Sequence, residues 1–161
     1  MESKPFKVVI SKAERGDLPQ ILALQKAAFL SEAEAINDFS IQPLTQTLTD
    51  IEADFDAGPI LKAVESGRGK IAGSVRAYAD ADGAHIGKLV VHPDYQNNGI
   101  AKRLLQEIEA AFPAVGRFVL YTRVTSVKNI ALYRKAGYRE FGRERVSEKL
   151  EFAHMEKTES D

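Results

Sequence analysis

The stretch from Ile86 to Ala110 combines residue types that could hold a phosphate group. An apolar run that predicts a strand is followed by a polar turn at residues 92–98 and then by a helix with regularly spaced apolar residues. The first turn of a helix exposes backbone N–H groups and the positive end of the helix dipole. Gly99 and Ala101 leave that backbone accessible to an anion, and Lys102 adds positive charge. These residues predict a cradle for phosphate or pyrophosphate.

Two familiar phosphate-binding signatures do not fit the chain. The spacing G-x-x-x-x-G-K-[ST] of the P-loop is absent from the sequence. The glycines at Gly67, Gly69 and Gly73 resemble a dinucleotide fingerprint only loosely, because the last glycine is displaced by one residue. They also join a strand to a strand, so a hairpin turn is predicted there. A different phosphate-bearing cofactor is therefore expected.

The composition excludes several other kinds of chemistry. The 161 residues include no cysteine, which rules out disulfides, thiolate metal sites and a cysteine nucleophile. His85, His92 and His154 are far apart and lack metal-ligand spacing, so no metal is expected. The formal net charge of −1 gives no reason to expect nucleic acid or a membrane as a partner, and no apolar run is long enough to span a bilayer. A cytoplasmic protein is expected.

The elements that must position the cradle follow a mixed α/β pattern. The expected strands are Phe6–Ile10, Ile60–Glu65, Lys70–Ala79, Ala84–Val91, Phe118–Val124, one around Phe141 and Ser147–Met155. The expected helices are one from Asp17 to Phe29, then Leu44–Phe55, Ile100–Phe112 and Ser126–Ala136. Residues 30–44 are predicted to be irregular. No repeat or linker interrupts this pattern, which indicates one domain over residues 1–161.

Two motifs within this pattern resemble signatures of one family. Residues 89–101, LVVHPDYQNNGIA, are similar to the acetyl-CoA-binding motif of the GNAT superfamily of N-acetyltransferases, which reads apolar-x-Val-x-Pro-x-x-[Arg/Gln]-x-x-Gly-x-[Gly/Ala]. Residues 129–138, NIALYRKAGY, resemble the second family signature, Leu-Tyr-x-x-x-Gly-[Phe/Tyr]. The motifs stand in the family's order, and the predicted elements match its fold over nearly the whole chain. The match is weakest at residues 30–58.

The resemblance implies a fold and a cofactor. The fold would be a mostly antiparallel sheet of six to seven strands, with helices on both faces and a parallel pair splayed at the cofactor site. The cofactor would be acetyl-CoA, whose acetyl and pantetheine arm pairs with one strand and whose pyrophosphate is held by main-chain N–H groups. The implied cofactor-binding residues are Leu89, Val90, Val91, Gln96, Asn97, Asn98, Gly99, Ile100, Ala101, Lys102 and Asn129.

The resemblance also implies that Tyr133 is the general acid that protonates the departing CoA thiolate. A phenol is a feasible donor to a thiolate. The chain departs from the family pattern at Ser126, where many members have Asn, and at Tyr121, where some protein N-terminal acetylating members carry a catalytic Glu. The general base stays unassigned, with Glu65, His85 and a water chain as candidates.

Alternative interpretations remain for these residues. Tyr133 could be an ordinary core residue, and Lys102 could belong to a solvated helix face. The function could be direct acetyl transfer to a primary amine or non-catalytic acyl-CoA binding in a regulatory domain; a nucleotide-binding protein is disfavoured. The acceptor is a small molecule or a peptide, and its binding site should be formed by residues 30–58 and about 142–148. By family analogy the last strands could also support a homodimer.

Overall fold

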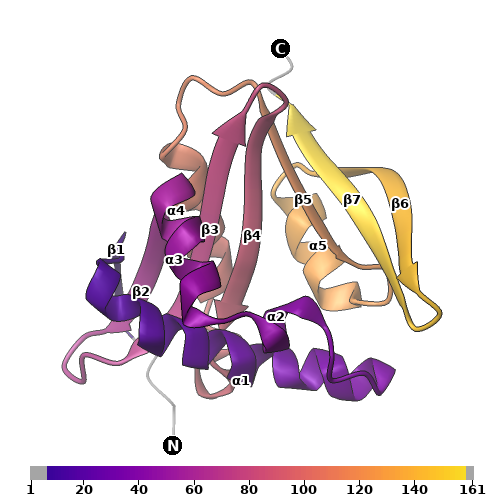
Figure 1. Cartoon of the computed structure of the whole chain (residues 1–161). Helices are drawn as coiled ribbons and strands as arrows, with labels where there is room; N and C mark the ends of the chain where they lie inside the picture. The colour runs from indigo at the N-terminus through magenta and orange to yellow at the C-terminus, as the bar shows by residue number, and fades with distance from the viewer. Residues whose placement is uncertain (1–6, 159–161) are drawn as a thin grey trace, which may run out of the picture.

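The computed structural model describes residues 7–158, and a single seven-stranded sheet runs through them (Figure 1). The strands lie in the order β1-β2-β3-β4-β5-β7-β6, and every neighbouring pair is antiparallel except β4 and β5. The strands are β1 (Val8–Lys12), β2 (Ile60–Glu65), β3 (Ile71–Asp80), β4 (Gly83–Val91), β5 (Arg117–Arg123), β6 (Arg139–Ser147) and β7 (Leu150–Thr158). The mixed, mostly antiparallel sheet predicted from the sequence is confirmed.

Helices cover both faces of this sheet, as predicted (Figure 1). One face carries α1 (Leu18–Ile36), α2 (Gln42–Thr45) and α3 (Leu48–Ala57), and the other carries α4 (Ile100–Ala110) and α5 (Val127–Lys135). Helix α4 packs on the sheet because its apolar residues recur at helical spacing and are buried. These residues are Ile100, Leu104, Leu105 and Ile108. None of the helices in the described part of the chain is long and apolar enough to cross a membrane.

Strands β4 and β5 separate soon after they meet. Their parallel pairing covers Ala84 with Phe118 and His85 with Val119, whereas β5 pairs with β7 from Arg117 to Arg123. Figure 1 shows the two strands diverging. The second half of β4 therefore has no strand partner on the side of β5, and an extended ligand could add to that edge.

The segment between the first helix and the second strand differs from the prediction. Helix α1 continues through residues 30–36, where irregular structure was predicted, and is held near β5 because Arg123 Nε donates to Glu32 Oε2 (2.7 Å). The predicted helix Leu44–Phe55 is two helices. Thr47 divides them, because its hydroxyl accepts from the backbone N–H of Asp50 (3.2 Å) and caps α3.

The two ends of the sheet also differ from the predicted strands. The first strand is Val8–Lys12; Phe6, the first residue of the predicted strand, lies outside the described residues. Strand β6 spans Arg139–Ser147, so the loop expected at residues 142–148 is mostly strand. Most of its residues are exposed, so the sequence shows little of the alternation expected of a strand. It is a strand because it pairs with β7 over nearly its whole length.

Candidate active site

A cleft of about 370 Å³, here called the cofactor cleft, lies where β4 ends and α4 begins. Its wall includes these predicted residues: Leu89, Val90, Val91, Gln96, Asn97, Gly99, Ile100, Ala101, Lys102 and Asn129. Asn98 is not part of this wall. Its side-chain amide donates to the carbonyls of Tyr95 (3.1 Å) and Gln96 (2.9 Å), so it stabilises the turn.

The start of α4 has the features that an anion-binding helix terminus requires. Gly99 has a left-handed backbone (φ 75°), and a Cβ atom built on it would meet no atom within 4 Å, so the space beside it is open. No side chain in the described residues caps the N-terminus of α4, which leaves its first N–H groups available to a ligand. Lys128 brings a positive charge there, donating to Asn97 Oδ1 (3.1 Å).

Two residues near this turn, Arg103 and Glu65, make structural hydrogen bonds. Arg103, which could have added charge to the cradle, donates instead to the Val8 carbonyl (3.3 Å) on β1. Glu65, a candidate general base, is buried and accepts a hydrogen bond from the Tyr95 hydroxyl within the turn that precedes α4. Glu65 lines neither the cofactor cleft nor the cavity that contains Tyr133, and this position does not support a role as base.

A second cavity, of about 360 Å³, opens from the cofactor cleft and is here called the acceptor cavity. Four residues line both, so the two cavities adjoin: Phe29, Glu32, Leu89 and Asn129. Tyr133 lines the acceptor cavity and is 7% exposed. Burial, together with the charge of Glu32, raises the pKa of Tyr133, so the phenol keeps its proton at neutral pH and can act as a donor.

The sequence comparison decides the family. The profile of the acetyltransferase (GNAT) domain matches residues 33–159, which is most of the chain. The chain belongs to the GNAT acetyltransferase family. It is also 28% identical over 119 residues to the UPF0157 protein YqkA of Bacillus subtilis (strain 168), covering 74% of this chain and 34% of that protein. The chain thus spans about a third of the length of the curated relative that it matches.

Solved structures show the same fold. The ribosomal-protein-S18-alanine N-acetyltransferase from Escherichia coli superposes with a TM-score of 0.77 at 20% identity, covering 96% of each chain. The PaiA N-acetyltransferase from Thermoplasma acidophilum, solved in complex with coenzyme A, gives a TM-score of 0.75 at 17% identity, covering 94% of this chain and 99% of that one. At these identities the likeness concerns the GNAT fold alone.

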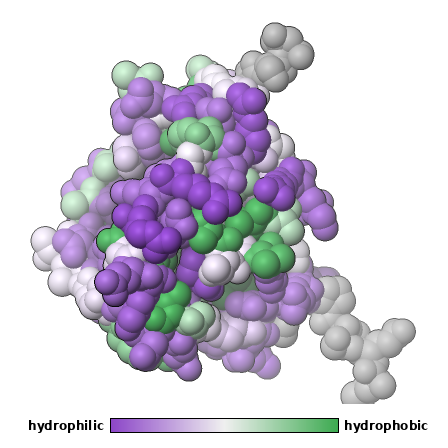
Figure 2. All heavy atoms as spheres, turned by 90° about the vertical axis from the view of Figure 1, so that its right-hand side faces the viewer, coloured by the Kyte–Doolittle hydropathy of each residue, from purple (hydrophilic) through white to green (hydrophobic). Residues whose placement is uncertain are grey.

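A third cavity of this GNAT domain, about 480 Å³, continues from the acceptor cavity over the sheet and is here called the aromatic cavity. Its lining includes Tyr78, His85, Tyr121, Phe141 and His154. Figure 2 shows the molecule from the side of β6 and β7, where hydrophobic side chains gather within a largely hydrophilic surface. His85 stacks on Tyr78 (centroids 4.7 Å apart), bonds to Asp80 (2.9 Å) and does not line the acceptor cavity, so its position does not support a role as base.

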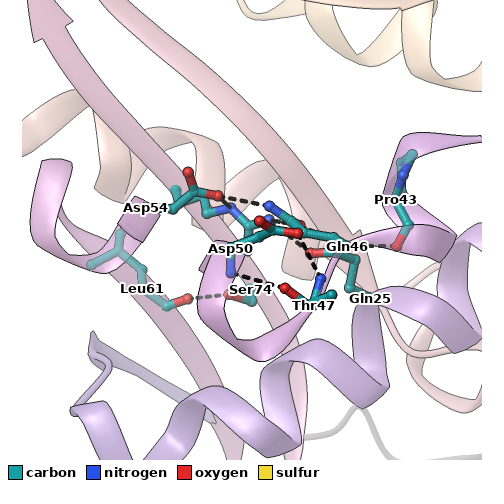
Figure 3. Close-up of polar contacts among 9 residues, drawn as sticks. Gln25, Pro43, Gln46, Thr47, Asp50, Asp54, Leu61 and Ser74 are labelled. Atoms are coloured by element: carbon teal, nitrogen blue, oxygen red, sulfur yellow. Dashed lines mark hydrogen bonds and ion pairs between the residues drawn. The ribbon is translucent and has the colours of Figure 1, made fainter. Parts of the chain in front are cut away.

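A buried polar network between the helices and the sheet was not predicted from the sequence (Figure 3). Arg76 of β3 donates to the side-chain oxygens of Gln25 (2.8 Å) and Gln46 (2.7 Å) and lies 3.2 Å from a carboxylate oxygen of Asp54. Gln25 also donates to the carbonyl of Pro43 (2.8 Å). The network fixes α1, α2 and α3 over β3, and thereby positions one wall of the acceptor cavity.

Lys88 is a further residue of the cavities that was not predicted from the sequence. It lines both the acceptor cavity and the aromatic cavity, and its backbone is left-handed (φ 52°). Burial and the charge of Arg76 lower the pKa of Lys88 to about 8, against the opposing effect of Asp54. A single lysine within the apolar run from Ile86 to Val91 was the available signal. No metal-binding group of three or more acidic or histidine side chains occurs in residues 7–158.

Proposed function

We propose that the chain, as one domain over residues 1–161, transfers the acetyl group of acetyl-CoA directly to a primary amine. The observation that carries this proposal is the junction of the two cavities at Leu89 and Asn129, with the buried phenol of Tyr133 lining the acceptor side. Membership of the GNAT family supports the same reaction. The absence of cysteine from the sequence is consistent with direct transfer rather than a thiol-bound intermediate.

The residues of the cofactor cleft fit acetyl-CoA. The N-terminus of α4 from Gly99 to Lys102 would hold the pyrophosphate through backbone N–H groups, with the cations of Lys102 and Lys128 beside it. The open edge of β4 at Leu89–Val91 would pair with the extended pantetheine arm. When bound, acetyl-CoA supplies the acetyl thioester at the junction of the cavities.

Tyr133 completes the reaction as the general acid. The neutral amine forms a bond to the acetyl carbon while the carbon–sulfur bond breaks, and Tyr133 gives its proton to the departing thiolate. The nitrogen loses its excess proton to solvent, and the Tyr133 phenolate recovers a proton from solvent. The raised pKa of Tyr133 keeps the phenol protonated before the reaction. It also makes the phenol a weaker acid, so the transfer of its proton to the thiolate must be coupled to the loss of the proton of the amine. Burial also excludes the bulk water that would otherwise compete as a donor.

Calorimetric titration of the folded protein tests the cofactor first. Acetyl-CoA and CoA should bind saturably, whereas ATP and NAD should not. Amine-dependent release of the CoA thiol then tests the transfer. Binding of CoA without thiol release from a broad panel of amines would favour a non-catalytic acyl-CoA-binding regulatory domain, and failure to bind CoA would overturn both interpretations.

The acceptor class follows from the family only in outline. The acceptor is an amine of a small molecule or a peptide, and a spermidine N-acetyltransferase is among the structural neighbours. A homodimer through the last strands remains a prediction. β6 lies at the edge of the sheet and carries the exposed Phe141 and Val146, so light scattering at micromolar concentration would test it.

A further inference from the structure

Lys88 occupies the extra position of a β-bulge in β4. Ser74 pairs with Val90 and Arg76 pairs with Gly87, so Lys88 and Leu89 together face the single residue Val75. The left-handed backbone of Lys88 (φ 52°) is uncommon for a residue with a side chain. Bulges redirect a side chain that would otherwise follow the alternation of the strand, and they are common beside active sites. Here Lys88, at the bulge, lines both the acceptor cavity and the aromatic cavity.

The ammonium group of Lys88 differs from the arginines around it. Each arginine that lines the acceptor or aromatic cavity has a carboxylate partner: Arg76 with Asp54 (3.2 Å), Arg117 with Glu156 (2.8 Å) and Arg123 with Glu32 (2.7 Å). Lys88 has no carboxylate oxygen within 4 Å and no hydrogen-bond acceptor among residues 7–158. A half-buried ammonium without a partner favours an anion supplied by a ligand.

The charges near Lys88 agree with an anionic ligand. The charged groups that act on it are Arg76 from β3 and Asp54 from α3, and these two already form an ion pair with each other. Tyr121 of β5 lines the same two cavities, and its raised pKa keeps it neutral.

Two carboxylates also line the acceptor cavity: Glu32 pairs with Arg123 (2.7 Å), and Asp38 accepts from the Ser40 hydroxyl (2.6 Å). Protonated Lys88 is therefore the cation of the acceptor cavity that lacks a carboxylate within 4 Å among the described residues.

The remainder of the acceptor cavity is largely apolar. Its lining includes Ile36, Ile41, Ile86, Leu120, Leu150 and Phe152. Lys88 also directly precedes Leu89, which lines both the acceptor cavity and the cofactor cleft. An anion bound by Lys88 would therefore lie in the same cavity as the amine that is acetylated.

We propose that the acceptor is a small amine that carries a carboxylate near its nitrogen and an apolar side chain, as a free apolar amino acid does, and that Lys88 binds the carboxylate. This inference rests on the proposed acetyl transfer and names its substrate class. A cavity of about 360 Å³ lies at the lower end of the range for small-molecule sites, which suits a ligand of that size. The N-terminus of a peptide, with an amide in place of the carboxylate, would leave Lys88 without a partner.

The experiment compares amines that differ in the anionic group. Thiol release from acetyl-CoA is measured with L-methionine against L-methioninamide and with L-phenylalanine against L-phenylalaninamide, and kcat/KM is expressed per unprotonated amine. The acids should be preferred at least about tenfold, as expected for a charge-assisted hydrogen bond. Aminoethyl phosphate against ethanolamine forms a third pair. If aminoethyl phosphate is preferred over ethanolamine by more than the acids are preferred over their amides, the ligand of Lys88 is a phosphate and not a carboxylate. A preference for the amides would contradict the anion site and favour a peptide N-terminus as the acceptor.

Variants assign the preference to one side chain. Lys88→Met should reduce the acid-to-amide ratio to near one, and Lys88→Arg should retain part of it. Lys135→Met is the matched control, because Lys135 is exposed at the end of α5 and lines none of the three cavities. Circular dichroism establishes that each variant is folded. A folded Lys88→Met protein that keeps the wild-type ratio would contradict the proposal.

Failure of this inference is distinct from failure of the proposed function. If the protein releases thiol with amines of every charge at similar efficiency, acetyl transfer stands and the carboxylate site does not. If the wild-type protein binds acetyl-CoA but releases no thiol with any amine, the transfer itself is contradicted.

Discussion

The cofactor cleft and the acceptor cavity share a boundary but are built in different ways. Most residues that line the cofactor cleft come from one continuous stretch, Leu89 to Lys102, which includes the start of α4 without a side-chain cap. The residues that line the acceptor cavity come from separate segments: α1, the α2 segment, β4, β5, α5 and the β6–β7 hairpin. The first region should therefore be sensitive to changes that alter backbone access, and the second to changes of individual side-chain chemistry.

The largest effect is expected from Gly99→Glu in the cofactor cleft. The open space beside Gly99 admits a side chain, but a carboxylate there would repel the pyrophosphate and compete for the first N–H groups of α4. The left-handed backbone adds a cost of roughly 1–2 kcal/mol for a residue with a Cβ atom. Calorimetry should record a loss of acetyl-CoA affinity of at least about 100-fold, the equivalent of about 2.8 kcal/mol.

Gly99→Asn separates charge from backbone strain. Asparagine tolerates the left-handed region better than most residues and carries no charge. Its loss of affinity should be much smaller than that of Gly99→Glu. Equal losses would mean that conformation, and not an anion at the helix terminus, explains the effect.

Tyr133→Phe tests the side chain on the acceptor side of the boundary. The phenylalanine ring can keep the packing of Tyr133 against Tyr138 (centroids 6.0 Å apart), so the change removes the hydroxyl alone. Loss of a general acid should lower kcat by about 100-fold and leave acetyl-CoA affinity within about twofold. Steady-state kinetics and calorimetry measure the two quantities separately.

Tyr138→Phe is the matched control for Tyr133→Phe. The Tyr138 hydroxyl donates to Glu109 on α4 (2.7 Å), and Tyr138 lines none of the three cavities. This variant should lose stability and keep kcat. A similar fall in kcat for both variants would show that Tyr133 acts through packing.

The same contrast explains what could be predicted from the sequence. The cofactor region depends on local signals: Gly99 precedes the helix, and Leu104, Leu105 and Ile108 repeat at helical spacing, so the strand, turn and helix were found at nearly their observed bounds. Tyr133 followed from the family motif, and the structure places it in the acceptor cavity, although its chemical role stays a prediction.

The acceptor region could not be predicted because its features arise from pairing between distant segments. The bulge at Lys88 depends on the register between β3 and β4, which neither strand encodes alone. Arg76 is buried because Gln25, Gln46 and Asp54 from three other segments satisfy it. The outer part of α1 lacks a strong apolar pattern because it borders a cavity and is held partly by the Glu32–Arg123 ion pair.

The pH dependence of inhibitor binding tests whether Lys88 binds a carboxylate in the acceptor cavity. A carboxylate that lacks the amine, such as 3-(methylthio)propionate, should compete with the acceptor and contribute no amine titration of its own. The pKa of Lys88 is about 8 in the free protein, and a bound anion favours the charged form and raises that pKa. The inhibition constant should be flat below pH 8 and rise about tenfold per pH unit above it.

Lys88→Met serves as the control in this titration. Its inhibition constant should be high at every pH and should show no change of slope near pH 8. A slope that survives in Lys88→Met would assign the titration to another group, and a flat wild-type profile would contradict the role of Lys88.

The smallest effect is expected on stability, where Lys88→Met should stabilise the fold at neutral pH. The pKa of Lys88 falls from 10.5 to about 8 on folding, so the unfolded chain binds more protons between these values and wild-type stability rises with pH across that window. Below pH 8 the buried charge carries its full cost. After allowance for its partial exposure, methionine should raise the free energy of unfolding by about 1 kcal/mol at pH 7. Urea denaturation at pH 7 and pH 10.5, with Lys135→Met as reference, should show this gain at the lower pH and its loss at the higher. A gain that persists at pH 10.5 would assign the effect to packing of the methionine side chain. The charge of Lys88 would then carry no stability cost, contrary to what is expected of a lysine retained to bind an anion.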